Sequence, residues 1–288
     1  MRLRLLMMAG VIAAAVAITP ESRSRASGPK TGLLCTLANA KVDESSGVAV
    51  SRRSAGVYWT HNDSGDGPNF YAFDRNGRDL GTFTLSRAQA IDWEDMASAR
   101  IGGRPYLYFG DIGDNAERRK SVIVYRVPEP RAVSGRHNID EFRAFTLRYP
   151  DGAHDCETLM VTPKGDIHLV TKSEYETSGI YRAGRLEKSG TYRLVKIGDL
   201  KLEAGNVYSR MVTGGDINAA GNRIVIRTYF TALAFRTNNL DRWFKSKPVE
   251  VEIPFERQGE AICFDGNAAR LITTSERNPC RVSFARLP

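Results

Sequence analysis

Five short segments of the chain repeat one pattern, and this repetition limits the possible folds more than any other feature. Each segment opens with a polar residue, continues as a short apolar strand, and is followed after a turn by a second strand that ends in polar residues. The segments begin at Glu44, Glu94, Glu157, Thr213 and Glu260, at intervals of 50, 63, 56 and 47 residues. Periods of this length are typical of propeller blades that carry loop insertions.

The second strands support the same interpretation. The distance from the start of a segment to the polar end of its second strand is 15 residues in the last three segments, 17 in the second and 18 in the first. Turn sequences such as Asp265-Gly266 separate the strands, as in hairpins. We therefore predict an all-β chain that forms a single β-propeller with four-stranded antiparallel blades. Five blades are the simplest count, and six are the alternative because the interval from Glu94 to Glu157 could contain another blade.

The ends of the chain predict how the ring closes. The last repeat has only three strands, and the segment 32–37, ahead of the first repeat, could supply the missing outer strand. Such a closure removes an exposed sheet edge. It would place Cys35 and Cys280 on adjacent strands, where they could form a disulfide or remain two free buried thiols. The four cysteines include no C-x-x-C pair, which argues against a zinc site.

The N-terminus has the pattern of a secretory signal peptide. Arg2 and Arg4 precede an apolar run of 14 residues, and small residues follow. We predict a signal peptide over residues 1–26, with cleavage after Ala17 or Ala26, and a propeller domain over residues 27–288; an uncleaved anchor is the alternative. The protein is then exported to the periplasm or the extracellular space, as a monomer that has no membrane association after cleavage. The net charge of +8 is spread along the chain, which argues against a nucleic-acid partner.

Propeller topology brings the segment starts and the second-strand ends to one mouth of the central channel. Several carboxylates gathered there would repel one another unless they were protonated, paired or bound to a cation. Ca²⁺ is the simplest such cation outside the cell. The predicted metal ligands are Glu44, Glu94, Glu157, Glu260, Asp63 and Asp111. The alternative is that these acidic residues accept hydrogen bonds from backbone N–H groups of the next blade and only fasten the ring.

Two functions fit such a pocket. The first is a binding module for a small molecule, a glycan or a protein partner. The alternative is a metal-assisted hydrolase of ester or phosphoester substrates. In that case Asp111 or His154 would act as the base, Glu157 would hold the metal, and Lys172 and Arg227 would stabilise negative charge. The sequence contains no G-x-S-x-G, H-E-x-x-H or Walker motif, so a serine nucleophile has no support.

Five strings of the sequence resemble those of a family of exported bacterial β-propeller proteins. They are Thr60–Gly65, Gly110–Asn115, Tyr125–Pro130, Tyr149–Glu157 and Gln258–Ile262. The resemblance runs from about Glu44 to Glu276 and implies a propeller fold and export. The acidic blade openings are more distantly similar to those of phytase-like and esterase-like propellers. That distant similarity implies Ca²⁺-assisted hydrolysis of phosphate esters, as an analogy between scaffolds.

Overall fold

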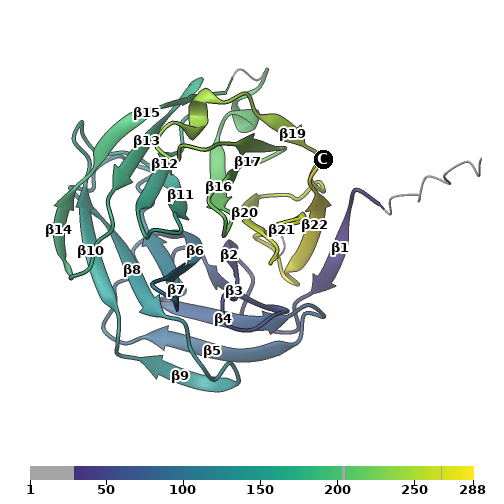
Figure 1. Ribbon diagram of the computed structural model, residues 1–288. Coiled ribbons are helices and arrows are strands. Elements are labelled where there is room, and N and C mark those ends of the chain that lie inside the picture. Colours follow the sequence, from purple (N-terminus) through teal and green to yellow (C-terminus); the bar gives the residue numbers. More distant parts are fainter. Residues whose placement is uncertain (1–28, 203–204, 267) are drawn as a thin grey trace, which may run out of the picture.

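The protein is a five-bladed β-propeller, with five sheets arranged around a central axis (Figure 1). The computed structural model describes residues 29–202, 205–266 and 268–288. The predicted signal peptide, 1–26, lies outside this described part. Blade one contains β2 (Ser45–Val50), β3 (Val57–Asn62), β4 (Asn69–Asp74) and β5 (Asp79–Leu85). Blade two contains β6 (Trp93–Ile101), β7 (Arg104–Asp111), β8 (Val122–Pro128) and β10 (Arg143–Arg148). The five-bladed prediction is confirmed.

The other three blades follow in chain order. Blade three contains β11 (Cys156–Val161), β12 (Ile167–Thr171), β13 (Thr177–Ala183) and β15 (Val195–Lys201). Blade four contains β16 (Val212–Ile217), β17 (Arg223–Thr228), β18 (Ala232–Arg236) and β19 (Val249–Val251). Blade five contains β20 (Gly259–Phe264), β21 (Arg270–Ser275), β22 (Arg281–Arg286) and β1 (Thr31–Thr36). The innermost strands β2, β6, β11, β16 and β20 each contact the two neighbouring inner strands, which closes the channel wall.

The hydrophobic core is divided among the blade interfaces. Five clusters of buried side chains lie between successive sheets, one for each pair of neighbouring blades. Trp59, Phe70 and Phe109, for example, pack between blades one and two. Because strand residues alternate between the two faces of a sheet, every blade can bury one set of side chains against each neighbour.

The ring closes as the sequence predicts. Strand β1 pairs antiparallel with β22, so both ends of the described chain belong to blade five. Cys35 and Cys280 belong to one buried cluster there, but all four cysteines are free. The predicted disulfide is therefore not formed, and the alternative of free buried thiols holds. Burial raises the pKa of Cys35 to about 11 and that of Cys280 to about 12.

Two blades differ from the four-stranded prediction by one added strand each. Strand β9 (Gly135–Ile139) pairs in parallel with β5 of blade one, although the chain has already passed into blade two. Strand β14 (Gly190–Arg193) adds to β10 in the same way, from the blade that follows. These excursions cover the outer edges of two sheets. They also explain the long interval after Glu94 without a sixth blade.

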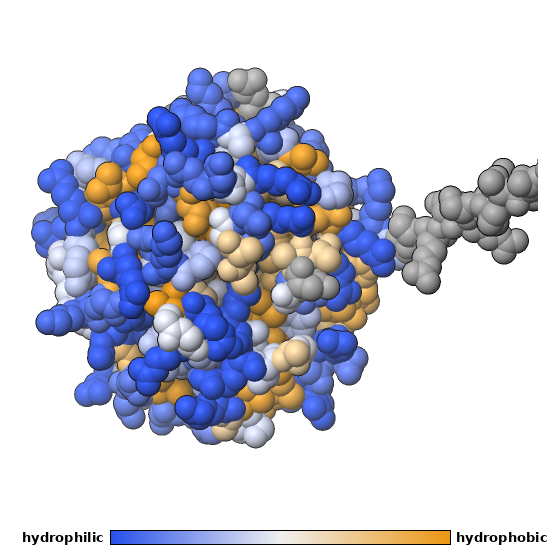
Figure 2. Space-filling view, in the orientation of Figure 1, coloured by the Kyte–Doolittle hydropathy of each residue, from blue (hydrophilic) through white to orange (hydrophobic). Residues whose placement is uncertain are grey.

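The surface is mostly polar. In Figure 2 hydrophilic residues cover most of the visible face, and hydrophobic residues are scattered among them. The helices in the described part of the chain are the 3-10 turns η1 (Val207–Ser209) and η2 (Trp243–Lys245). Neither of these described helices is long and apolar enough to cross a membrane.

Candidate metal centre at the channel mouth

Each inner strand begins with a β-bulge at the same place in its blade. The pairing register between first and second strand shifts once near the start of all five inner strands. The residues at these bulges are Ser46, Glu94, Glu157, Thr213 and Glu260. A bulge leaves its extra residue outside the regular ladder and re-aims its side chain. The five bulges therefore form one layer of polar residues at the mouth of the channel.

Three of these bulge residues bring buried carboxylates together. Glu94, Glu157 and Glu260 each offer an oxygen, and these oxygens all lie within 4.8 Å of one another. Their side chains come from blades two, three and five, and all three residues are buried. Ser46 donates a hydrogen bond to Glu260 Oε2 at 3.3 Å, from the inner strand of blade one. The layer thus gathers oxygen atoms from four blades around the axis.

Burial and mutual repulsion change the acidity of this cluster. Burial raises the pKa of Glu94 well above its usual range, and the neighbouring carboxylate of Glu157 raises it further. The pKa of Glu260 is raised well above its usual range for the same two reasons. Burial raises the pKa of Glu157 to about 7, although the ammonium group of Lys172 acts in the opposite direction. Ionised together at neutral pH, these groups need a cation to neutralise them.

A second carboxylate group shares Glu94. Oxygens of Asp63, Asp92 and Glu94 also lie within 4.8 Å of one another, at the outer side of the mouth where Asp63 and Asp92 are partly exposed. Burial, followed by the charge of Asp63, raises the pKa of Asp92 to about 6. Gly113 closes over this group: a Cβ there would lie 2.2 Å from Glu94 Oε1 and 2.5 Å from Asp92 Oδ2. Only glycine lets the loop approach the carboxylates so closely.

The positive charge at the mouth is provided by Lys172. Its Nζ lies 2.6 Å from Glu157 Oε1, and the charge of Glu157 raises the pKa of Lys172 despite burial. The ammonium group also lies 5.6 Å from the ring centroid of Tyr229. One lysine cannot neutralise three buried carboxylates. The other oxygen of Glu157, Oε2, is buried and has no hydrogen-bond partner among the described residues. An unpaired buried carboxylate oxygen is costly unless a ligand completes it.

Glu44, which the sequence predicts as a metal ligand, lies outside the cluster. It precedes β2, is exposed, and forms an isolated bridge with Glu276. The register of blade one shows that Ser46, two residues later, is the equivalent of Glu94 and Glu157. The sequence pattern selected the nearest acidic residue, because nothing in it marks the position of a bulge.

Other acidic residues fasten neighbouring blades, which is the alternative role considered for the glutamates. Asp95 Oδ2 accepts a hydrogen bond of 2.9 Å from the backbone N–H of Leu159 in blade three. Asp216 Oδ2 accepts one of 2.9 Å from the backbone N–H of Phe264 in blade five. Both aspartates lie one turn of the pleat or more beyond the bulge, deeper in the channel wall. The two roles are thus divided between different residues of the same strands.

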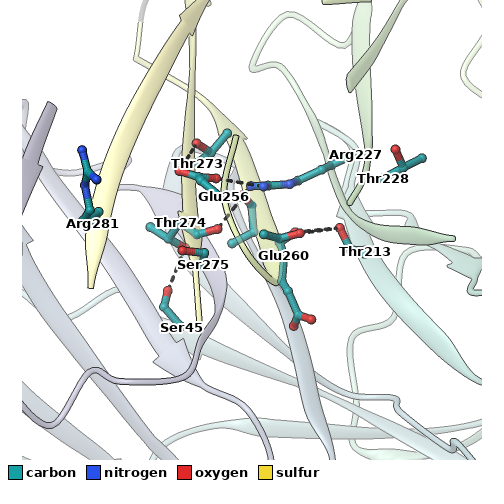
Figure 3. A network of polar contacts seen from close by, with 12 residues as sticks. Ser45, Thr213, Arg227, Thr228, Glu256, Glu260, Thr273, Thr274, Ser275 and Arg281 are labelled. Carbon is teal, nitrogen blue, oxygen red and sulfur yellow. Dashed lines mark hydrogen bonds and ion pairs between the residues drawn. The ribbon is translucent and has the colours of Figure 1, made fainter. Parts of the chain in front are cut away.

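Asp111 and Arg227 are both held in internal contacts. Asp111 is fully buried, lies 2.8 Å from Arg119 Nη2, and accepts the backbone N–H of Asp92 at 3.2 Å. It therefore positions the loop that carries Asp92. Arg227 Nη2 lies 2.8 Å from Glu256 Oε2, and its Nη1 donates to the carbonyl of Thr274 at 3.2 Å (Figure 3). Arg227 thus joins blades four and five.

His154 lies apart from the carboxylates. Its Nε2 is 3.1 Å from Asp151 Oδ1 and 2.9 Å from the hydroxyl of Tyr181, which belongs to the third strand of blade three. Of the five predicted catalytic residues, the structure thus places Glu157 and Lys172 in the cluster and Asp111 behind its loop. Asp92 and Gly113 were missed by the sequence analysis. The one signal for Asp92 was its position two residues before Glu94.

The cation-free protein is expected to lose stability as the pH rises from about 5 to 8. In this range the unfolded chain has already lost its carboxyl protons, whereas Glu94, Glu260 and Asp92, whose pKa values are raised, still hold some of theirs. The folded state then binds more protons, so the free energy of unfolding falls with increasing pH. We expect the melting temperature to drop by about 5 °C or more. Melting curves in chelator across this range check the sign; a rise in melting temperature would contradict it.

No protein-family model matches the chain, and no significant match is found among curated proteins. The five-bladed fold agrees with the resemblance described above, whereas membership of that family stays a prediction.

Proposed function

We propose that this protein is a cation-dependent binding module. The buried glutamates Glu94, Glu157 and Glu260 hold a divalent cation at the channel mouth, and the cation binds an oxygen-rich ligand. The observation that carries this proposal is the unpaired, buried Oε2 of Glu157 within a group of carboxylates whose oxygens lie within 4.8 Å. The donor set contains oxygen atoms alone, with no histidine or cysteine, which favours Ca²⁺ over zinc or copper.

The rim of the mouth supports binding of a ring-shaped ligand such as a glycan. Large side chains are strongly exposed in loops at the same strand ends as the carboxylates. Tyr175 follows β12 and is 82% exposed, and Phe255 precedes β20 and is 83% exposed. Exposed aromatic side chains near a polar pocket are typical of binding surfaces. We also propose that the protein is exported and works outside the cytoplasm, where Ca²⁺ is abundant enough to occupy such a site.

Metal-assisted hydrolysis of an ester or phosphoester is the second candidate. Glu94 belongs to both carboxylate groups, so it could bridge two cations, and paired metals stabilise the attacking and leaving oxygens in many hydrolases. Lys172 would then stabilise developing negative charge. Against this candidate, Arg227 and His154 make contacts elsewhere and supply neither a base nor an oxyanion contact at the cluster.

Adding Ca²⁺ to chelator-treated protein is expected to raise its melting temperature by about 5–10 °C. A ligand at 100 times its dissociation constant stabilises the folded state by about 2.7 kcal/mol, and each kcal/mol corresponds to about 2–4 °C for a domain of this size. Calorimetric titration gives the affinity and stoichiometry. If Ca²⁺, Mg²⁺ and Mn²⁺ all leave both the melting temperature and the calorimetric signal unchanged, the proposed site is wrong.

The same Ca²⁺-loaded protein separates the two candidates. Turnover of a panel of esters and phosphoesters that stops in chelator would support the hydrolase. A further rise in melting temperature with oligosaccharides, without turnover, would support the binding module.

A further inference from the structure

A cavity of about 670 Å³ opens on the rim opposite the carboxylates. Glu94 and Asp111 lie at one end of the β6–β7 hairpin, whereas the cavity is lined by the other end, including Arg100 and Arg104. The end of β8 and the start of β10 complete the wall. The cavity therefore belongs to a different face of the propeller from the candidate metal centre, and its volume is in the range of small-molecule sites.

Arginine dominates the lining of this cavity. It is lined by the six arginines Arg53, Arg100, Arg104, Arg126, Arg131 and Arg143 and by the three glutamates Glu129, Glu141 and Glu187. Two of the glutamates are occupied. Glu129 is buried and accepts hydrogen bonds from the backbone of Arg52 at 3.0 Å and from the indole of Trp59 at 3.1 Å. Glu187 contacts both Arg185 and Arg126. The lining keeps an excess of three positive charges.

The arrangement of these arginines is not balanced by the protein itself. Within the described part of the chain, the side chains of Arg104 and Arg131 make no ion pair or hydrogen bond, and both are exposed. Arg143 lies directly opposite Arg126 in the β8–β10 pair. Like charges in directly opposed positions destabilise a sheet. A fold that retains such a pair gains from an anion bound between the two guanidinium groups.

The floor of the cavity holds one arginine rigidly. Arg126 is 7% exposed, and its guanidinium carbon lies 5.2 Å from the ring centroid of Tyr106 and 5.4 Å from that of Phe145. Its Nη1 donates to the carbonyl of Leu186 at 2.9 Å. A fixed guanidinium loses little conformational entropy when it binds an oxyanion, and its fork fits phosphate oxygens in pairs.

We propose that this arginine pocket, formed by Arg100, Arg104, Arg126, Arg131 and Arg143, binds a phosphate-bearing ligand. A phosphate group carries about 1.5 to 2 negative charges at neutral pH, so two phosphate groups match the charge excess of the lining. A soluble diphosphate compound and a lipid headgroup present the same chemistry. The site is independent of the proposed cation at the other rim.

The test titrates the full chain in chelator with inorganic pyrophosphate by calorimetry at low salt. Chelator leaves the acidic mouth without cations, so that rim repels the probe. We expect binding by the wild type, and a loss of affinity of at least about tenfold in the double variant Arg104→Gln/Arg131→Gln. Arg281→Gln is the matched control, since it removes an exposed arginine at the start of β22, and should bind as wild type.

A second arm identifies the source of the phosphate. Co-sedimentation with phosphatidylglycerol vesicles, compared with phosphatidylcholine vesicles, tests the headgroup with the same variants. Arginine-dependent binding in either arm supports the proposal. It is overturned if neither probe binds, if the double variant binds as the wild type does, or if citrate binds as tightly as pyrophosphate, because the pocket would then lack preference for phosphate. A failure here leaves the Ca²⁺ titration unaffected.

Discussion

Replacing Arg227 by methionine is expected to lower the free energy of unfolding by about 3–5 kcal/mol. Arg227 is fully buried, and its removal leaves the carboxylate of Glu256 in a dry interior with Thr273 as a remaining partner, at 3.0 Å. Breaking one side of a buried ion pair has this cost because the other charge stays uncompensated. Denaturant unfolding followed by fluorescence measures the change. The difference should be concentrated at the interface between blades four and five, where Arg227 lies (Figure 3).

Two control variants make this expectation specific. Arg223→Met changes another arginine of β17, whose contact is a single hydrogen bond of 3.2 Å to the carbonyl of Ala268, and should cost about 1 kcal/mol or less. The double variant Arg227→Met/Glu256→Gln removes the stranded charge and should recover part of the lost stability. Equal stability of Arg227→Met and wild type would show that the pair contributes nothing to the fold.

The repeat pattern predicted the architecture because blade geometry leaves a mark in the sequence. The segment starts and strand ends recur at nearly constant spacing, and the N-terminal strand completes blade five as expected. The added strands β9 and β14 left no such mark. They are short, largely exposed and polar, so the alternation of apolar residues that identifies a buried strand is absent from them.

The site was predictable only in part, for a geometric reason. Spacing places residues on a rim to within one or two positions, but a one-residue bulge decides which side chain turns toward the axis. For this reason Glu94, Glu157 and Glu260 were identified and Glu44 was misassigned in place of Ser46. The partner of Arg227 was also invisible, since Glu256 lies 29 residues away in the chain. A buried arginine and a catalytic arginine look alike in a sequence until their partners are known.

The division of acidic residues between two tasks connects the fold to the site. Asp95 and Asp216 each accept two backbone N–H groups, one from their own strand and one from the next blade. Their charges are thus solvated by the protein itself. Glu94 and Glu260 receive no comparable set of donors, and their pKa values are raised by burial and by Glu157. Charge that the fold does not neutralise is a reserve for a bound cation.

Glu94→Gln is therefore expected to weaken Ca²⁺ binding by at least about 100-fold while stabilising the cation-free protein. Glu94 is the only residue common to both carboxylate groups found among the described residues, so its loss weakens both at once. Loss of supporting contacts alone costs 10–100-fold at metal sites, and a direct ligand costs more. The neutral amide also removes repulsion from Glu157 and Glu260, which should raise the melting temperature in chelator by a few degrees.

Glu44→Gln is the matched control for this experiment. It makes the same chemical change at another acidic blade opening, but at an exposed residue outside both carboxylate groups. Calorimetry should give it the affinity of the wild type, and melting in chelator should be unchanged. The opposite ranking, with Glu44→Gln losing Ca²⁺ and Glu94→Gln keeping it, would place the cation at the exposed rim rather than in the buried layer. Equal, undiminished affinity in both variants would remove the carboxylate cluster as the cation site.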